Sequence, residues 1–296
     1  MATTCTEAST SKFVKTANWR IHYNEAGTGH PVFFLHGTGP GASGWSNFNQ
    51  NIRLAEKYRL FMIDFPGWGR SDELSPGGPR SDVLAQSLLE MMDGLSIDKA
   101  AFVGNSMCGM ATMEFASRWP ERMSHAITMG AGVMGPPLLT GGGMSEGIRV
   151  LVDAYREPTP ENFRRLVQVM VFDGSYETDA LMKQRSDAAL ENKTHLKNWL
   201  EGFLSSRPKP NPELIPRLMA LKVPTLFIHG RDDRTVHWEN SLRGVSIVPN
   251  SRLVLLNRCG HWAQLEHARE FEALIDNFIS QSSAFGDAGK AADVGG

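Results

Sequence analysis

The segment from Ala100 to Thr112 constrains the fold more than any other part of the chain. The apolar run Ala-Ala-Phe-Val leads into Gly104, Asn and Ser106, and then into the small-residue stretch Met-Cys-Gly-Met-Ala-Thr. This pattern is typical of a buried strand that turns sharply at a serine and continues as a helix. Such a turn exposes the hydroxyl above the sheet, beside the helix amino terminus. We therefore predict a nucleophilic Ser106 and expect the backbone N–H of Met107 to stabilise an oxyanion.

The turn departs from its usual pattern at one position. Cys108 stands where a second glycine is expected, and Gly109 follows one residue later. Cysteine packs as a small hydrophobic residue, so we expect the turn to persist. We do not expect Cys108 to be the nucleophile, because its place in the helix turns the side chain away from the site.

Apolar runs alternate along the chain with stretches of helical periodicity. This alternation predicts the α/β class, with a mostly parallel central sheet flanked by helices. A hairpin is expected at the amino-terminal edge, from Phe13–Val14 and Ile21–Tyr23. The buried strands are expected at Val32–Leu35, Leu60–Ile63, Ala100–Val103, His125–Met129, Thr225–Ile228 and Leu253–Leu256. Helices are expected at Asp82–Gly94, Met107–Trp119 and Gln264–Ser280.

A long segment between Met129 and Pro224 contains no convincing strand. It is bounded by Gly/Pro-rich stretches and has helical patterning, which predicts an inserted helical cap domain better than a structureless loop. We expect the small, polar end of the chain to be disordered. The expected helices are Glu146–Tyr155, Pro160–Phe172 and Thr178–Leu190. The division that follows is a core of residues 1–132 and 213–282, a cap of 133–212, and a tail of 283–296.

A serine hydroxyl needs a base, and the base needs an orienting carboxylate. His261 is the best placed of the histidines, because it follows the last predicted strand through a short loop. The loop after the strand that ends at Ile228 carries two neighbouring carboxylates, Asp232 and Asp233. We predict the triad Ser106, Asp233 and His261, with Asp232 as the alternative acid.

A glycine-rich loop runs from His36 to Trp45 and follows the first large strand. Its backbone can bring a second N–H to the oxyanion. The same loop matches a dinucleotide-binding fingerprint through Gly39-x-Gly41-x-x-Gly44, with Asp64 about twenty residues on. A nicotinamide-dependent oxidoreductase is therefore an alternative. Pro40 within the loop argues against it, and it would leave the predicted triad unexplained.

Composition and charge exclude several kinds of partner. The formal net charge of -2 provides no electrostatic reason to expect nucleic acid or an anionic membrane. We see no span-length apolar run and no secretory signal, and the three scattered cysteines suggest neither a disulfide framework nor a metal site. We expect a cytoplasmic protein that binds a small molecule and needs neither metal nor cofactor.

Three motifs together resemble one family. They are His36-Gly-Thr-Gly-Pro-Gly-Ala-Ser-Gly-Trp-Ser-Asn47, Val103-Gly-Asn-Ser-Met107 and Arg258-Cys-Gly-His-Trp-Ala-Gln264. In this combination the chain resembles the meta-cleavage product hydrolases, which are carbon–carbon bond hydrolases of the α/β-hydrolase superfamily. The resemblance implies a 2-hydroxy-6-oxohexa-2,4-dienoate substrate from aromatic degradation. It also implies a second oxyanion donor at Thr38 or Gly39, and a homo-oligomer.

The resemblance also implies which residues bind the substrate. Arg185 matches the position that pairs with the substrate carboxylate, and its planar fork suits that anion. Asn47, Asn105 and Trp262 match further binding positions. Met170 and Thr235 stand where relatives often carry bulky aromatics. Their smaller side chains fit an aryl acyl group, which we favour, or an alkyl-preferring pocket that is lined from elsewhere. A carboxylesterase remains the main alternative, and a non-catalytic binding protein a more remote one.

Overall fold

An eight-stranded sheet forms the centre of the computed structural model, which describes residues 5–74, 81–131, 139–141, 143–205 and 211–285. The strand order is β1-β2-β4-β3-β5-β6-β7-β8. β1 and β2 pair antiparallel, as do β2 and β4, and every other pairing is parallel. The strands are β1 (Ser11–Lys15), β2 (Arg20–Ala26), β3 (His30–Leu35), β4 (Tyr58–Ile63), β5 (Ala100–Asn105), β6 (Met123–Met129), β7 (Thr225–Gly230) and β8 (Ser251–Leu256).

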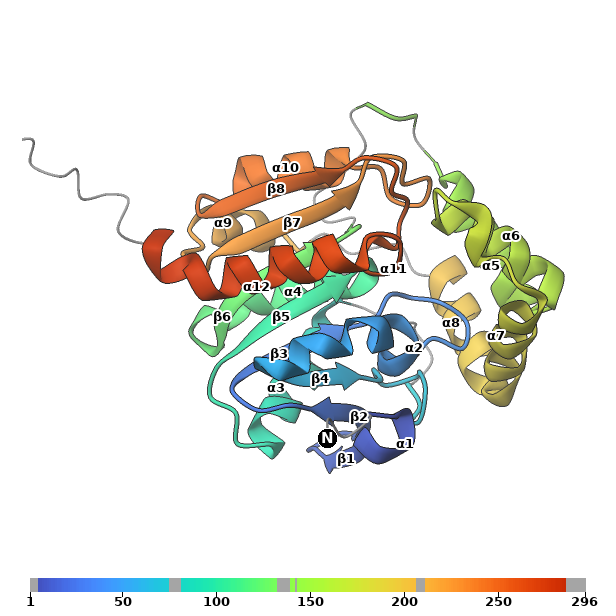
Figure 1. Cartoon of the computed structure of the whole chain (residues 1–296), viewed down its shortest axis with the longest axis horizontal. Helices are drawn as coiled ribbons and strands as arrows, with labels where there is room; N and C mark the ends of the chain where they lie inside the picture. Colours follow the sequence, from blue (N-terminus) through green and yellow to red (C-terminus); the bar gives the residue numbers. More distant parts are fainter. Residues whose placement is uncertain (1–4, 75–80, 132–138, 142, 206–210, 286–296) are drawn as a thin grey trace, which may run out of the picture.

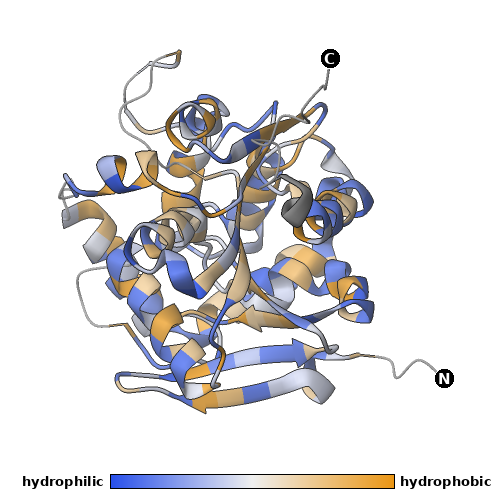
Figure 2. Ribbon diagram, turned by 90° about the vertical axis from the view of Figure 1, so that its left-hand side faces the viewer, coloured by the Kyte–Doolittle hydropathy of each residue, from blue (hydrophilic) through white to orange (hydrophobic). Residues whose placement is uncertain are grey.

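Helices cover both faces of this sheet (Figure 1). Because successive side chains of a strand point to opposite faces, Phe33 and Leu35 enter one core cluster while Val32 and Phe34 enter the other. The first cluster lies under α3 (Ser81–Gly94), α4 (Met107–Arg118), α9 (Leu214–Met219) and α10 (Glu239–Ile247). The second lies under α2 (Gly44–Phe48), η1 (Asn49–Glu56), α11 (Ala263–Glu266) and α12 (Ala268–Phe285). The helices in Figure 2 carry both hydrophobic and hydrophilic residues, as an amphipathic covering layer must.

A group of four helices lies to one side of the sheet, at the right of Figure 1. Three begin at a Ser or Thr whose hydroxyl accepts a backbone N–H of the first turn: Ser145 from Ile148, Thr159 from Asn162, and Thr178 from Leu181. The group comprises α5 (Glu146–Arg156), α6 (Pro160–Met170), α7 (Asp179–Glu191) and α8 (Lys193–Ser205), with η3 (Gly174–Tyr176) between α6 and α7.

The four helices approach the core closely at Gly41. This glycine has φ +68°, and a Cβ there would stand 2.7 Å from the backbone nitrogen of Ala189 in α7. A larger residue would therefore push α7 away from the glycine-rich loop. These helices lie within the predicted cap of 133–212, whose extent as a domain remains a prediction.

The predicted strands and hairpin are present, each within a few residues of its predicted bounds. The predicted helix Gln264–Ser280 is divided at His267 into α11 and α12. We did not predict several helices, which are α1 (Glu7–Thr10), α2, η1, η2 (Pro120–Arg122), η3, α8, α9 and α10. Residues 283–285 of the predicted disordered tail belong to α12, and the rest of that tail lies outside the described residues. Within the described ranges, no helix combines the length and the apolar character needed to cross a membrane.

Candidate active site

Ser106 lies at the sharp turn between β5 and α4. Its φ of +55° is rare for a residue with a Cβ, and its N–H donates to the carbonyl of Met129 at 2.8 Å. Gly104 permits the turn, because a Cβ there would stand 2.4 Å from the carbonyl oxygen of Cys108. Met107 opens α4, where a helical N–H has no intrahelical acceptor. The turn thus presents both a hydroxyl and an unused backbone donor.

Cys108 lies in the core below this turn. It is fully buried, and burial raises the pKa of its thiol well above the usual value. The thiol is therefore protonated and inert at neutral pH, because the thiolate is the nucleophilic form.

His261 and Asp233 are joined by a short hydrogen bond. His261 Nδ1 lies 2.7 Å from Asp233 Oδ2, and both side chains are buried. Burial alone would raise the pKa of the Asp233 carboxyl, but its contacts with His261 and His229 outweigh burial and hold the pKa well below its usual range. Asp232 instead lies 3.5 Å from Arg231. Of the two neighbouring carboxylates, Asp233 is the one that contacts the histidine.

Most of the predicted site residues line one pocket. Asp233 stands behind His261, and the side chain of Met107 is buried beside Ser106. The predicted residues that line the pocket are Thr38, Gly39, Asn47, Asn105, Ser106, Met170, Arg185, Thr235, His261 and Trp262.

Three polar atoms of this pocket have no hydrogen-bond partner among the described residues. They are Oγ1 of Thr38, Oδ1 of Asn105 and Nε of Arg185. The guanidinium of Arg185 lies 5.2 Å from the ring centre of Trp262, and within the described ranges no carboxylate pairs with it. Buried polar groups in native proteins are usually satisfied, so these atoms leave hydrogen-bonding capacity for a polar ligand, and the guanidinium of Arg185 suits an anionic group on it.

The comparisons with known proteins agree with this geometry. A family model described as the alpha/beta hydrolase fold matches residues 30–268. The 2-hydroxy-6-oxononadienedioate/2-hydroxy-6-oxononatrienedioate hydrolases of Paraburkholderia xenovorans and Escherichia coli are each 42% identical to this chain. These matches cover 93% of the chain and 97% and 98% of the relatives. The chain belongs to the meta-cleavage product hydrolases of the α/β-hydrolase family.

Solved structures place the hydrolase in the same group. The 2-hydroxy-6-oxo-6-phenylhexa-2,4-dienoate hydrolase of Rhodococcus sp. strain RHA1 superposes with a TM-score of 0.81 at 28% identity, covering 91% of this chain and 98% of that one. A meta-cleavage product hydrolase from Pseudomonas fluorescens IP01 gives 0.80 at 29% identity, covering 92% and 98%. The predicted fold and family are therefore confirmed.

Gly37, Pro40 and Ala42 of the glycine-rich loop also line the pocket of this hydrolase, and the rest of its lining is apolar and comes from α5 and α6. Sequence reasoning identified Met170 from this set but not the others, because their inward faces depend on how the two helices dock on the core. The apolar side chains are Ile148, Leu151, Phe163, Leu166, Val167 and Met170.

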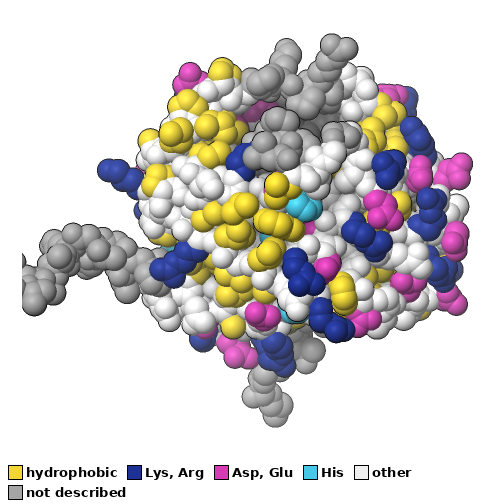
Figure 3. Space-filling model, turned by 90° about the horizontal axis from the view of Figure 1, so that it is seen from above, with side chains coloured by type: hydrophobic (Ala, Val, Ile, Leu, Met, Phe, Trp, Pro, Cys, Tyr) yellow, Lys and Arg dark blue, Asp and Glu magenta, His cyan; other side chains and the backbone are white. Residues whose placement is uncertain are grey.

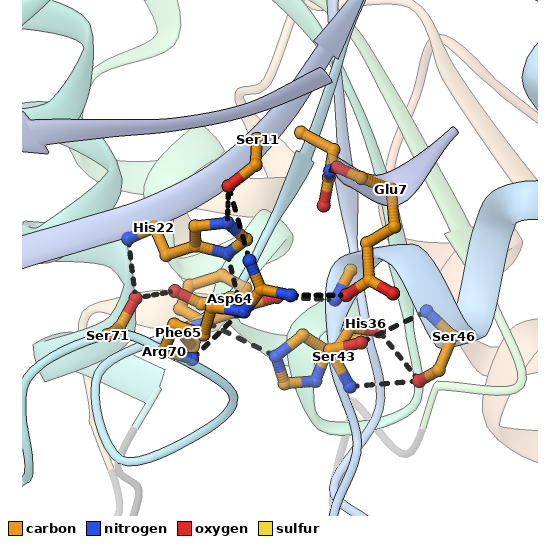
Figure 4. Close-up of polar contacts among 12 residues, drawn as sticks. Glu7, Ser11, His22, His36, Ser43, Ser46, Asp64, Phe65, Arg70 and Ser71 are labelled. Atoms are coloured by element: carbon orange, nitrogen blue, oxygen red, sulfur yellow. Dashed lines mark hydrogen bonds and ion pairs between the residues drawn. The ribbon is translucent and has the colours of Figure 1, made fainter. Parts of the chain in front are cut away.

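The dinucleotide alternative required an available Asp64. In the hydrolase Asp64 is buried within a polar network, shown in Figure 4. Its Oδ1 accepts the N–H of Gly44 at 2.8 Å, and its Oδ2 accepts the N–H of Arg70 at 3.0 Å and lies 2.7 Å from His22 Nδ1. Both oxygens therefore hold the chain around the glycine-rich loop and are not directed at a ligand.

His229 is a contact of the acid that sequence reasoning missed. Its Nε2 lies 3.3 Å from Asp233 Oδ2 and 2.8 Å from the carbonyl of Val236, while its Nδ1 lies 2.7 Å from Ser241 Oγ. The signal was a second histidine four residues before Asp233, at the end of the same strand. Among the described residues, no group of His, Cys, Asp or Glu side chains could hold a metal ion.

Proposed function

We propose that this hydrolase cleaves the bond between C5 and C6 of a 2-hydroxy-6-oxohexa-2,4-dienoate to form 2-hydroxypenta-2,4-dienoate and a carboxylic acid. Arg185 carries the proposal. Its guanidinium lines the same pocket as Ser106 and His261, and among the residues that the structure describes no carboxylate pairs with it. A neutral ester has no use for such a cation, whereas a dienoate supplies the planar carboxylate that a guanidinium binds through two parallel hydrogen bonds.

The reaction follows from the arrangement of these groups. The substrate dienol is first converted to its keto form, so that the departing carbon becomes the end of a delocalised dienolate. His261 accepts the Ser106 proton while Asp233 orients the imidazole, and Oγ attacks C6. The oxyanion accepts the N–H of Met107 and a second N–H from Thr38 or Gly39. The C5–C6 bond breaks, the dienolate is protonated, and water activated by His261 releases the acid from the acyl-enzyme.

We further propose an apolar acyl group, with an aryl group favoured. The relatives named for a dienedioate act on a compound with two carboxylates, whereas the Rhodococcus enzyme is named for a phenyl substrate. Among the described residues that line the pocket, Arg185 is the one Lys or Arg side chain, and α5 and α6 contribute aliphatic and aromatic side chains. A second carboxylate would be buried there without a partner, which is costly.

The test is an absorbance assay on the wild-type enzyme, because these dienolates are yellow and cleavage bleaches them. The substrates are 6-phenyl and 6-methyl 2-hydroxy-6-oxohexa-2,4-dienoate and 2-hydroxy-6-oxononadienedioate, with 4-nitrophenyl acetate as the ester control. We expect the fastest bleaching with the 6-phenyl compound. Brisk ester hydrolysis without bleaching would make the protein a carboxylesterase. Fastest bleaching of the dienedioate would overturn the acyl preference alone.

We also propose that the protein is a homo-oligomer that pairs through β8. The two edge strands of the sheet differ, because β1 carries Lys12 and Lys15, which discourage edge pairing. β8 carries the hydrophobic residues Leu253, Val254 and the exposed Leu255, and Arg252 is its one charged residue. Hydrophobic side chains gather on the face seen in Figure 3, which looks down on the side where β8 lies. Two copies of β8 can pair antiparallel about a twofold axis.

Sedimentation analysis tests this assembly. We expect the wild-type protein to sediment as a dimer or larger species and Leu255→Lys to sediment as a smaller one. A monomeric wild-type protein would contradict the proposal.

We also propose a cytoplasmic location, which the three free cysteines support, because reducing compartments keep thiols free.

A further inference from the structure

The end of α6 lies directly against the loop that carries His261. The backbone N–H of His261 donates to the carbonyl of Met170, the last residue of α6, at 2.6 Å. Gly260 makes the approach possible, because a Cβ there would stand 2.5 Å from that same oxygen and 2.9 Å from Cα of Val171. The main chain of His261 is therefore held by the helices that cover the pocket as well as by the core.

One carboxylate, that of Glu266, joins the two sides of this contact. On the core side, its Oε1 accepts the N–H of Gly260 at 2.8 Å. On the other side, its Oε2 accepts the N–H of Phe172 at 2.6 Å and lies 3.4 Å from the N–H of Asp173. Hydrogen bonds to an ionised acceptor are among the stronger ones in proteins. Glu266 thus binds the residue before His261 and the segment that follows Met170.

The same contact reaches the acyl part of the pocket. The side chain of Met170 lines the pocket, and its Sδ accepts the hydroxyl of Thr235 at 3.2 Å. The N–H of Thr235 donates to Asp233 Oδ1 at 2.8 Å. The side chains of Met170 and Thr235 therefore line the part of the pocket proposed for the acyl group, while their backbone groups bind His261 and Asp233.

We propose that Glu266 is a positioning residue for His261. It holds segment 170–173 against the loop that carries the base, so that the imidazole is aligned with Ser106. This proposal concerns the same active site as the proposed function and rests on the role of His261 as the base. It does not require that the substrate be a dienoate, because ester hydrolysis by the same triad needs the same alignment.

Glu266→Gln is the sharpest variant. Glutamine keeps the shape of the side chain, but one of its two ends is an NH₂ group that would face a backbone N–H. The matched control is Tyr176→Phe, which removes a hydrogen bond of 2.9 Å between the Tyr176 hydroxyl and the carbonyl of Leu265. That bond joins the same two segments without contacting Gly260 or Met170. Glu270→Gln, on an exposed carboxylate of α12, controls for the loss of charge.

We expect Glu266→Gln to lower kcat about 10- to 100-fold with KM within about twofold, as expected for a misplaced catalytic group. The factor should be similar for 6-phenyl dienoate and for 4-nitrophenyl acetate, and both controls should keep wild-type kcat. The dissociation constant of the dienoate, measured in Ser106→Ala, should be unchanged when Glu266→Gln is added. A kcat near that of the wild type, or equal losses in Glu266→Gln and Tyr176→Phe, would overturn the proposal.

A second pair of variants keeps the test decisive if Glu266→Gln does not fold. Phe172→Pro removes the N–H that Glu266 accepts together with the aromatic side chain, and Phe172→Ala controls for the loss of that side chain. Val171 has φ −117° and ψ 158°, an extended conformation that a following proline requires. We expect a lower kcat for Phe172→Pro than for Phe172→Ala on both substrates. Equal kcat values would overturn the proposal. If the wild-type enzyme turned over neither the ester nor the dienoate, that result would instead contradict the triad.

Discussion

Gly130 lies directly against the imidazole of His261. A Cβ on Gly130 would stand 2.9 Å from Nδ1 of His261 and 3.4 Å from Oδ2 of Asp233. Gly130 follows β6 and has φ +55°, a conformation that residues with a Cβ seldom adopt. The neighbouring strand β6 thus leaves room for the hydrogen bond between His261 and Asp233 only because position 130 has no side chain.

Replacing Gly130 with alanine should therefore displace the His261–Asp233 pair. We expect Gly130→Ala to lower kcat about 100-fold, because a shift of about 1 Å in a catalytic group has an effect of that size. KM should change little, since Gly130 does not line the pocket. Steady-state kinetics with a dienoate and an ester check this, with circular dichroism to show that the variant is folded. A folded Gly130→Ala enzyme with wild-type kcat would contradict it.

Ser106 should show the opposing demands of stability and catalysis. Its φ of +55° and ψ of −117° are strained for any residue with a Cβ. We expect Ser106→Gly to raise the free energy of unfolding by about 1–2 kcal/mol and Ser106→Ala to leave it nearly unchanged. Both variants should lose about 10⁶-fold in kcat. Thermal unfolding measures the first effect, and a Ser106→Gly variant no more stable than Ser106→Ala would refute it.

The sequence was sufficient to predict the sheet because its strands are apolar runs of characteristic length between turn residues. Thr225–Ile228, for example, is buried on both faces as predicted. The helix α8 was missed, although Leu196, Trp199 and Phe203 recur at helical spacing. The break that separates it from α7 is made by Asn192, whose Oδ1 accepts the N–H of His195 at 2.9 Å. Such a local cap resembles an ordinary loop residue in the sequence.

The candidate site likewise contains residues whose position the sequence predicts and contacts that it does not predict. Ser106 follows its strand directly, and Asp233 and His261 follow theirs through short loops, so their place at one edge of the sheet could be predicted. The partners of Glu266 could not, because Phe172 is 94 residues away in the chain and contributes a backbone N–H, which leaves no pattern in the sequence. The apolar lining from α5 and α6 likewise depends on how whole helices dock.

Asp233 should make the stability of the protein depend on pH. Its carboxyl has a lower pKa in the folded protein than in the unfolded chain, where it is about 3.9. The ionised group therefore stabilises the fold above pH about 4, and this contribution is lost as the pH falls through the folded-state pKa. We expect the free energy of unfolding of Asp233→Asn to fall less steeply than that of the wild type below pH about 4.

The same variant should lose about 10⁴-fold in kcat, because an asparagine can hold the imidazole in the wrong tautomer. Urea unfolding at several pH values and steady-state kinetics at neutral pH measure the two effects. Asp232→Asn is the matched control and should change kcat little. If Asp232→Asn were the variant that lost turnover, the assignment of the acid would be reversed.

Arg185 should stabilise the substrate complex while destabilising the free protein. Burial lowers the pKa of its guanidinium, and within the described ranges no carboxylate compensates the charge. An uncompensated buried charge is destabilising, so we expect Arg185→Met to raise the melting temperature. The exposed Lys183 of the same helix pairs with Asp187, and Lys183→Met should not raise it.

The same substitution should lower activity on the dienoate while it raises the melting temperature. We expect Arg185→Met to lower kcat/KM for the 6-phenyl dienoate about 100-fold or more, since a buried carboxylate would lose its charged partner. Hydrolysis of 4-nitrophenyl acetate should stay within about twofold of the wild-type rate, because this ester has no carboxylate. Equal losses on the two substrates would mean that Arg185 supports the pocket without binding the dienoate. A lower melting temperature would mean that the guanidinium has a structural partner in the folded protein.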